Sequence, residues 1–214
     1  MISKEKAVLR NPTFDNLPTI QGPTPRLGVL ASGSGTNFDA IAHAIEEGVL
    51  DADIACLVCN CPGAGAFDVA ERHGIDAELV DHREFSSRKS FDERVLEVLR
   101  AHDVEWVIMA GWMRLVTKGF IEAYAEKILN IHPSLLPSFK GIRAVEQALE
   151  AGVKITGVTV HHVVPEVDSG PIVAQAAVPI LPDDTADSLH ARIQEQEHFI
   201  YPRAIALAIA EERA

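Results

Sequence analysis

Three side chains able to catalyse acyl transfer stand in two short motifs of this chain. Asn130 and His132 lie two residues apart at the end of an apolar run, and Asp168 follows in a motif rich in glycine and proline. Residues i and i+2 of an extended strand share one face, so the amide and the imidazole can reach into one cleft. Asn can stabilise an oxyanion, His can transfer a proton, and Asp can hold an imidazolium. Together they suit the transfer of an acyl group to an amine.

The residues around these side chains limit how they can be placed. Pro133 and Pro137 follow His132 in the segment NIHPSLLP, and proline stops regular strand pairing, so we expect a fixed loop there. A lone histidine near a strand end is more often structural than catalytic, and a turn aspartate such as Asp168 is more often simply solvated. The pattern alone therefore leaves open a structural role for His132 and a simply solvated position for Asp168.

A glycine-rich turn, SGSGTNF at residues 32–38, stands where a first buried strand would pass into a helix. Glycine lets the backbone approach a ligand, and a helix N-terminus offers free N–H groups to an anion. The third glycine of the dinucleotide fingerprint is replaced by Phe38, and no Lys-Ser/Thr pair follows as in a Walker loop. The pattern favours a single phosphate over a nicotinamide cofactor or a nucleoside triphosphate, with a purely structural turn as the alternative.

Apolar runs alternate with amphipathic stretches through most of the chain. The apolar runs predict strands at residues 27–31, 54–58, 77–80, 106–110 and 128–131. The amphipathic stretches predict helices at residues 37–47, 64–73, 87–102, 117–125 and 144–150. This alternation implies parallel pairing, so we predict a single-domain α/β protein with a three-layer, doubly wound and mostly parallel sheet.

The alternation of predicted strands and helices changes in the C-terminal third. Two β-rich runs at residues 156–164 and 171–180 are joined by a short loop, which predicts an antiparallel extension of the sheet. A helix over residues 187–200 should then be kinked by Pro202 before a final Ala-rich segment.

Composition narrows the possible functions. The chain has 214 residues, 47% of them hydrophobic, which suits one core and one domain. With 19 Lys and Arg against 31 Asp and Glu, the net charge of −12 argues against a nucleic-acid partner. No apolar run is long enough for a membrane span. Residues 1–25 are mixed polar with four prolines, so we expect a poorly ordered N-terminal extension before a domain at residues 26–214.

Three cysteines crowd into one short stretch. Cys56 and Cys59 have the spacing of a metal or redox motif, with Cys61 close by, but a fourth zinc ligand at suitable spacing is missing. We interpret them as small apolar side chains on a buried strand in a reducing compartment, and we expect no metal site.

The segment NIHPSLLP at residues 130–137, with the later Asp168-Ser169-Gly170-Pro171, resembles the folate-dependent formyltransferases. The likeness runs from residue 27 to about residue 202. It implies a Rossmann-like formyltransferase fold and formyl transfer from 10-formyltetrahydrofolate to the amine of 5-phosphoribosyl-glycinamide. The products would be 5-phosphoribosyl-N-formylglycinamide and tetrahydrofolate, in de novo purine (IMP) biosynthesis. The expected protein is a cytoplasmic monomer or homodimer that acts on small molecules.

The resemblance also implies roles for individual residues. The catalytic residues would be Asn130, His132 and Asp168, supported by His161. The substrate phosphate would be held by Gly35, Thr36 and Asn37, with Glu197 contacting the same substrate. Folate would be bound by Arg88, Met113, Arg114, Leu115, Val116 and Asn130. Parts of the loop at residues 164–168 would close over the pterin ring.

Three rival functions make different demands on the sequence. Enzymes that hydrolyse the same folate carry an extra N-terminal regulatory domain and usually have His where this chain has Pro133. Formylation of an aminoacyl-tRNA would call for a further C-terminal domain and a basic surface. A catalytically silent binding module would be expected to lose Asn130, His132 or Asp168, and all three are present.

Overall fold

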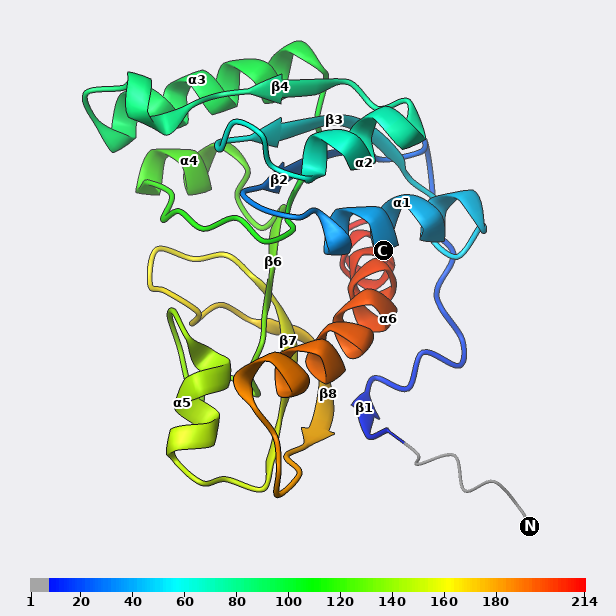
Figure 1. The fold of residues 1–214 in the computed structure, drawn as a ribbon. Coiled ribbons are helices and arrows are strands. Elements are labelled where there is room, and N and C mark those ends of the chain that lie inside the picture. The colour runs from blue at the N-terminus through cyan, green and yellow to red at the C-terminus, as the bar shows by residue number, and fades with distance from the viewer. Residues whose placement is uncertain (1–7) are drawn as a thin grey trace.

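Eight strands form one open sheet in the computed structural model, which describes residues 8–214 (Figure 1). Their order across the sheet is β1-β8-β7-β6-β5-β2-β3-β4. The strands are β1 (Arg10–Asn11), β2 (Arg26–Ala31), β3 (Asp53–Cys59), β4 (Ala77–Leu79), β5 (Trp106–Met109), β6 (Ile128–His132), β7 (Ile155–His162) and β8 (Ile172–Pro179). The helices are α1 (Thr36–Glu46), α2 (Ala66–His73), α3 (Arg88–Ala101), α4 (Lys118–Ala123), α5 (Ala144–Glu150) and α6 (Ala186–Glu212), with one 3-10 turn at His82–Glu84.

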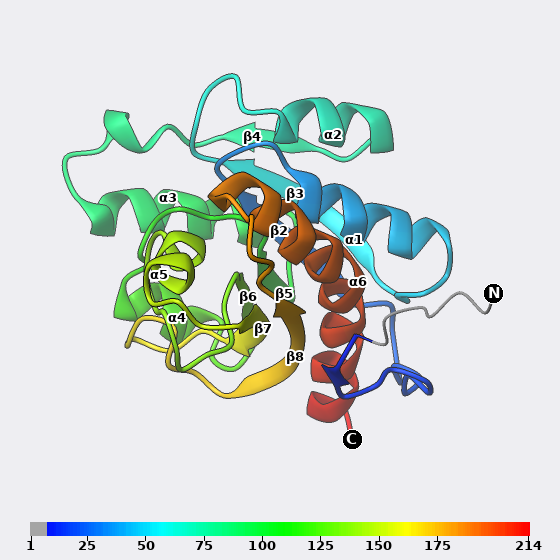
Figure 2. The same cartoon turned by 60° about the horizontal axis from the view of Figure 1, so that its bottom comes forward.

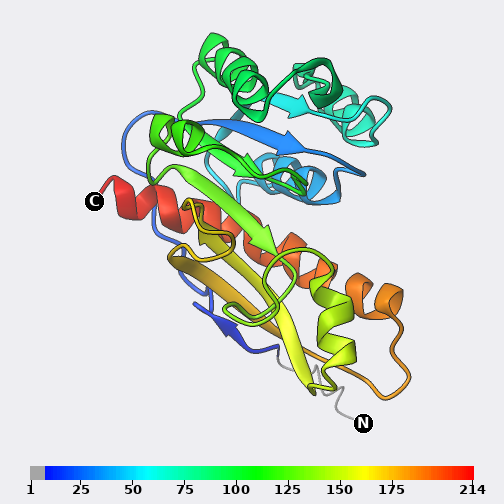
Figure 3. The same ribbon diagram turned by 90° about the vertical axis from the view of Figure 1, so that its left-hand side faces the viewer.

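The five strands β2 to β6 run parallel, as the alternating apolar pattern predicts. Four of them, β2, β3, β5 and β6, are buried along most of their length because helices cover both faces of the sheet, whereas the short edge strand β4 is largely exposed. The strands β7 and β8 pair antiparallel to β6 and to each other, which is the predicted antiparallel extension. Figure 3 shows the strands stacked from β4 at the top to β1 at the bottom, with α6 crossing behind them.

Two hydrophobic clusters lie on opposite faces of the sheet and make the three layers. One cluster joins the sheet to α1, α2 and α6 and includes Phe38, Ile41 and Tyr201. The other joins it to α3 and α4 and includes Phe91 and Phe120. Figure 2 shows α6 lying beside α1 over the same face. The predicted fold class is therefore confirmed.

Helix α6 is longer than the sequence predicts. It runs without interruption from Ala186 to Glu212, so Pro202 lies inside the helix and the Ala-rich segment belongs to the same element. Tyr201 and Pro202 are buried, and the Tyr201 hydroxyl lies 3.0 Å from the carbonyl oxygen of Met109 and 3.1 Å from that of Leu129. Packing on the sheet outweighs the loss of one helical hydrogen bond, which a local pattern cannot reveal.

The N-terminal segment departs from the expected poorly ordered extension. Residues 1–7 lie outside the described part, but residues 10–11 form β1, which pairs antiparallel with β8. The Arg10 guanidinium donates to Gln196 at 3.0 Å and lies 3.9 Å from the ring centre of Phe199. Contacts with residues almost two hundred positions away hold this segment, so local composition gave no sign of them.

The cysteines lie where the sequence analysis places them. Cys56 and Cys59 are buried in β3, and Cys61 follows the strand. Burial raises the pKa of the Cys56 thiol to about 12, so a metal-binding thiolate is disfavoured there. Across residues 8–214, every helix is too short or too polar to cross a membrane.

Gly157 in β7 provides a test of the packing between β7 and β8. A Cβ at this position would collide with the carbonyl oxygen of Ala176 and press on the Leu135 side chain. We expect Gly157→Ala to lower the free energy of unfolding by about 1–3 kcal/mol, the usual range for overpacking. Urea denaturation measures it, with Gly119→Ala as control, because a Cβ at Gly119 meets no atom within 4 Å. Equal stability of the two variants would contradict this packing.

Candidate active site

Three loops that carry predicted site residues leave the same edge of the sheet. Because β2, β5 and β6 are parallel neighbours, their carboxyl ends lie together. Gly35 follows β2, Met113 follows β5, and His132 is the last residue of β6. From β2 the chain proceeds outward to β3 and β4, then returns to form β5 on the other side of β2. Ligands bind open α/β sheets at such a switch in strand order.

His132 is buried, and both of its ring nitrogens face acceptors. Its Nε2 donates to the carbonyl oxygen of Phe139 at 2.8 Å, and its Nδ1 lies 3.4 Å from Oδ2 of Asp168. A carbonyl and a carboxylate can only accept, so an imidazolium with a proton on each nitrogen satisfies both contacts. The sequence predicted that Asp168 would lie near His132, and the structure brings the two together across 36 residues of chain.

His161 joins the same group from the neighbouring strand. It is opposite Asn130 in the antiparallel pairing of β6 with β7, and its Nε2 lies 3.2 Å from the Asn130 side-chain nitrogen. Its Nδ1 donates to the carbonyl oxygen of His162 at 2.9 Å, which fixes the ring orientation. Oδ1 of Asp168 lies 3.6 Å from the same Nε2. His161 therefore contacts both the amide and the carboxylate.

Asp168 is held in place by its own loop and by the loop after β6. Its φ of 48° is left-handed, a conformation that Asp adopts more readily than most residues. Gly170 packs so closely on β7 that a Cβ would collide with the carbonyl oxygen of His162. The Gly141 N–H donates to Oδ2 of Asp168 at 2.8 Å. The loop is thus fastened on both sides of the carboxylate.

Asp168 stays ionised despite its partial burial. Burial opposes the negative charge, but the contact with His161, the Gly141 N–H and the charge of His132 together lower the pKa of Asp168 below its ordinary value. The carboxylate is therefore negative throughout the neutral range and can accept a hydrogen bond from the imidazole beside it.

The predicted phosphate end combines the start of α1 with α6. Gly35 precedes α1 with a φ of 80°, and a Cβ there would crowd the backbone of Ala66. The Thr36 hydroxyl accepts from the Gln194 side chain at 2.9 Å. The Asn37 side-chain nitrogen donates to Oε2 of Glu197 at 2.8 Å. The structure therefore brings the predicted residues of this group together, although Glu197 is 160 positions away from Asn37.

Glu197 differs electrostatically from Asp168. Its side chain is buried in α6, and burial raises its pKa above the ordinary value although the bond from Asn37 opposes the shift. Within the described structure, Oδ1 of Asn37 is buried without a hydrogen-bond partner. A protonated Glu197 has an O–H group that can donate to such an oxygen.

The loop after β5 exposes apolar side chains beside this edge. Met113 is 79% exposed and Leu115 is 52% exposed, whereas Arg114 and Val116 are half-buried. The loop is fastened at both ends. The Met113 N–H donates to the Ser32 hydroxyl at 2.9 Å, and the Thr117 N–H donates to Asp92 at 2.6 Å.

Several of these supporting residues were missed by the sequence analysis. Ser32 also donates to buried Asn60 at 2.7 Å, so β2, β3 and the loop after β5 are linked. Gln194 and Asp92 are further examples, each joined to a partner 25 or more positions away. A local pattern carries no signal for such pairs. Arg88 is exposed as the first residue of α3, one turn before Asp92.

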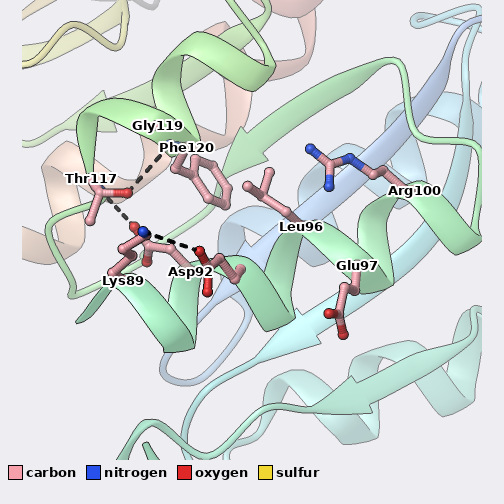
Figure 4. Close-up of a pocket in the computed structure, with 9 residues that line it drawn as sticks. Lys89, Asp92, Leu96, Glu97, Arg100, Thr117, Gly119 and Phe120 are labelled. Carbon is pink, nitrogen blue, oxygen red and sulfur yellow. Dashed lines mark hydrogen bonds and ion pairs between the residues drawn. The ribbon is translucent and has the colours of Figure 1, made fainter. Parts of the chain in front are cut away.

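A surface pocket lies elsewhere, between α3 and the start of α4 (Figure 4). It encloses about 400 Å³. The side chains that line it are Lys89, Asp92, Glu93, Leu96, Glu97, Arg100, Thr117, Gly119 and Phe120. None of the predicted site residues is among them. The Asp92 carboxylate in the pocket already accepts from Thr117, so we assign no chemistry to this hollow.

Comparison with known proteins identifies the family to which this chain is similar. A family model described as formyl transferase matches residues 25–205. The phosphoribosylglycinamide formyltransferase of Bacillus subtilis (strain 168) is 43% identical over 180 residues, covering 84% of this chain and 92% of that protein. The crystal structure of glycinamide ribonucleotide transformylase 1 from Symbiobacterium toebii matches with a TM-score of 0.87 and 48% identity, covering 90% of this chain and 91% of that one.

Some relatives are much longer than this chain. The trifunctional purine biosynthetic protein adenosine-3 of Gallus gallus is 44% identical over 188 residues, which make up 88% of this chain but 19% of that protein. This chain therefore spans about a fifth of that relative's length.

The raised pKa of Glu197 leads to a pH-dependent stability prediction. The buried carboxyl binds its proton more tightly in the folded than in the unfolded chain, so its contribution to stability is complete below the ordinary pKa of 4.5 and is lost as the pH rises through the higher folded pKa. Glu197→Gln is neutral at every pH and can still accept from Asn37. We expect its Tm to exceed that of the wild type at pH 8, with the difference shrinking at pH 4.

Thermal melting at both pH values measures this effect, with Glu195→Gln as the matched control because Glu195 is exposed on the same helix. A lower Tm for Glu197→Gln at pH 8, or the same difference at both pH values, would show that burial does not penalise the Glu197 charge.

Proposed function

Because the chain belongs to the formyl transferase family, we propose that it transfers the formyl group of 10-formyltetrahydrofolate to the amine of 5-phosphoribosyl-glycinamide. The products are 5-phosphoribosyl-N-formylglycinamide and tetrahydrofolate, a step of de novo purine biosynthesis. The observation that carries the proposal is the convergence of Asn130, His132 and Asp168 at the carboxyl edge of the sheet, beside the turn at Gly35.

The chemistry proceeds by direct attack of the amine nitrogen on the formyl carbon. A new C–N bond forms, and the formyl oxygen becomes an oxyanion in a tetrahedral intermediate. The Asn130 amide and an N–H of His132 donate to that oxygen, a kind of stabilisation that typically contributes about 3–4 kcal/mol for one donor. To do so, Nε2 of His132 exchanges its bond to the Phe139 carbonyl for one to the substrate.

Collapse of the intermediate breaks the bond between the formyl carbon and N10 of the folate. His132 gives a proton to N10 as tetrahydrofolate leaves, and the proton lost by the attacking amine returns through water to the His132–Asp168 pair. Asp168 supports both steps, since its pKa lies below the ordinary value and the carboxylate remains negative near neutral pH. The chain's own residues thus balance the protons without a covalent enzyme intermediate.

The acceptor is selected at its phosphate. Free N–H groups at the start of α1, after Gly35, can hold a phosphate although the net charge of the chain is −12. Thr36 and Asn37 lie in the same first turn, and Glu197 faces Asn37 where it can accept from a substrate N–H or O–H. The folded chain thereby offers a polar subsite matched to a phosphoribosyl group.

The folate lies along the loop after β5. Exposed Met113 and Leu115 offer apolar cover to a flat ring, and the backbone of residues 113–116 offers N–H and C=O groups to its amide-like edge. The Ser32 and Asp92 contacts fix this loop before the ligand arrives, which lowers the entropy lost on binding. Arg88 and the loop at residues 164–168 complete the folate contacts.

We also propose that the catalytic domain spans residues 26–214 and acts in the cytoplasm on small molecules alone, as a monomer or homodimer. The acidic composition argues against a nucleic-acid partner, because a net charge of −12 repels phosphate backbones.

Removing the imidazole tests the catalytic assignment. We expect His132→Ala to lower kcat by about 10²- to 10⁴-fold, the usual contribution of a general acid or base. His102→Ala serves as the control, since His102 lies at the far end of α3. Steady-state assays with saturating folate donor and acceptor measure both. Near-normal turnover of a correctly folded His132→Ala protein would overturn the mechanism.

The phosphate end should affect binding rather than chemistry. We expect Thr36→Ala to raise KM for 5-phosphoribosyl-glycinamide by about 10-fold, the loss of one hydrogen bond to a charged group. The value of kcat and the KM for the folate donor should change by less than about twofold. The phosphate is held equally in the ground state and the transition state, so losing this contact does not change the barrier of the chemical step. A larger effect on the folate KM would place the phosphate subsite elsewhere.

A further inference from the structure

Helices α1 and α2 bring together a group of metal-ligating side chains outside the proposed active site. Asp39 and His43 lie four residues apart on α1, so they share one face of the helix. His73, the last residue of α2, faces them. One carboxylate oxygen of Asp39, Nδ1 of His43 and a ring nitrogen of His73 all lie within 4.8 Å of one another.

The distances suit a small tetrahedral ion. Oδ1 of Asp39 lies 2.9 Å from Nε2 of His73 and 3.8 Å from Nδ1 of His43. A tetrahedral zinc centre with bonds of ~2.0–2.1 Å separates its ligand atoms by about 3.3 Å. These two separations lie on either side of that value, and the ring nitrogens of His43 and His73 lie within 4.8 Å of each other, so side-chain rotations can bring the three atoms to ligating distance.

A fourth residue orients His73. Its Nδ1 lies 2.7 Å from Oε1 of Glu46, so that nitrogen carries the proton that it donates and Nε2 is the ligating atom. A carboxylate on the second nitrogen of a histidine is the usual support for a metal-bound imidazole. The His73 side chain is only 7% exposed, whereas that of His43 is 54% exposed. The group therefore combines a fixed ligand with an open side for water.

The neighbouring charges and the ligand types determine which cations this group can bind. Arg72 reaches Oδ1 of Asp39 at 3.3 Å, but its side chain is more than half exposed and can turn into solvent. Two imidazoles and one carboxylate favour zinc-like transition ions over Mg²⁺ and Ca²⁺, which prefer oxygen ligands.

We propose that Asp39, His43 and His73 form a binding site for Zn²⁺ or a similar divalent transition ion, with Glu46 as the supporting carboxylate and water in the fourth position. The ion joins α1 to α2 close to Gly35 and strengthens this part of the fold. The sequence analysis expected no metal because the cysteine motif lacks a fourth zinc ligand, and it did not consider Asp39, His43 and His73, which lie on two different helices.

The test uses the full chain after EDTA treatment and dialysis, with Zn²⁺ as the probe in isothermal titration calorimetry. We expect one equivalent to bind. Loss of a ligand in His43→Gln or Asp39→Asn should weaken binding by more than about 10-fold, and Glu46→Gln by about 10- to 100-fold. The matched control is His190→Gln, an exposed histidine on α6 that should leave the affinity unchanged. Because His43 is exposed, its variant should fold normally.

Two further measurements separate this site from other zinc-binding groups. Co²⁺ bound here should show visible bands without a sulfur-to-cobalt charge-transfer band, and Zn²⁺ should raise the Tm of the wild type but not of His43→Gln. The proposal is overturned if Zn²⁺ does not bind, if His43→Gln binds it as tightly as the wild type, or if a sulfur band shows that the cysteines hold the ion. None of these readouts depends on formyl transfer.

Discussion

The Asp168 carboxylate is the interaction on which the proposed active site depends. It lies 3.4 Å from Nδ1 of His132 and 3.6 Å from Nε2 of His161, and it accepts from the Gly141 N–H at 2.8 Å. These contacts join the ends of β6 and β7 to two loops, so one carboxylate contacts both imidazoles of the centre, and His161 in turn contacts Asn130. A partly buried carboxylate is costly unless it is paired and hydrogen-bonded, and here the same contacts also hold the imidazole of His132 in place. The left-handed backbone of Asp168 and the close packing of Gly170 show that the loop is shaped around this requirement.

At the phosphate end of the site, the carboxyl group of Glu197 has the opposite pKa shift from that of Asp168. Glu197 is buried with one donor, Asn37, and its pKa is raised, whereas the pKa of Asp168 is lowered by its partners. Two carboxyl groups of one protein are thereby set to different protonation behaviour by their surroundings, a recurrent way of dividing roles within an active site. The fold makes this possible because α6 crosses the sheet beside α1 and brings Glu197 to the start of that helix. The raised pKa of Glu197 weakens its tendency to carry a negative charge beside the predicted phosphate subsite.

The fold class could be predicted from the sequence because the patterns that indicate it are local. Short apolar runs alternate with amphipathic stretches, and in the structure Gly74 ends α2 in a left-handed conformation while the Ser87 side chain caps the start of α3. The pairing of Asn130 with His132 on one face followed from strand periodicity. The contacts of Ser32 with Asn60, of Thr36 with Gln194 and of Arg10 with Phe199 could not be predicted, since each joins distant positions by three-dimensional packing. The continuation of α6 past Pro202 could not be predicted for the same reason, because burial against the sheet outweighs the loss of one helical hydrogen bond.

The central claim is that the centre at His132 moves a formyl group to one acceptor amine rather than to water. The most direct measurement is the ultraviolet absorbance of 10-formyl-5,8-dideazafolate mixed with the purified protein, with and without 5-phosphoribosyl-glycinamide. Loss of the formyl group only when the glycinamide is present is the predicted result, since the intermediate requires an amine nucleophile bound at the phosphate end. Loss of the formyl group at the same rate without the acceptor would show a hydrolase and contradict the account.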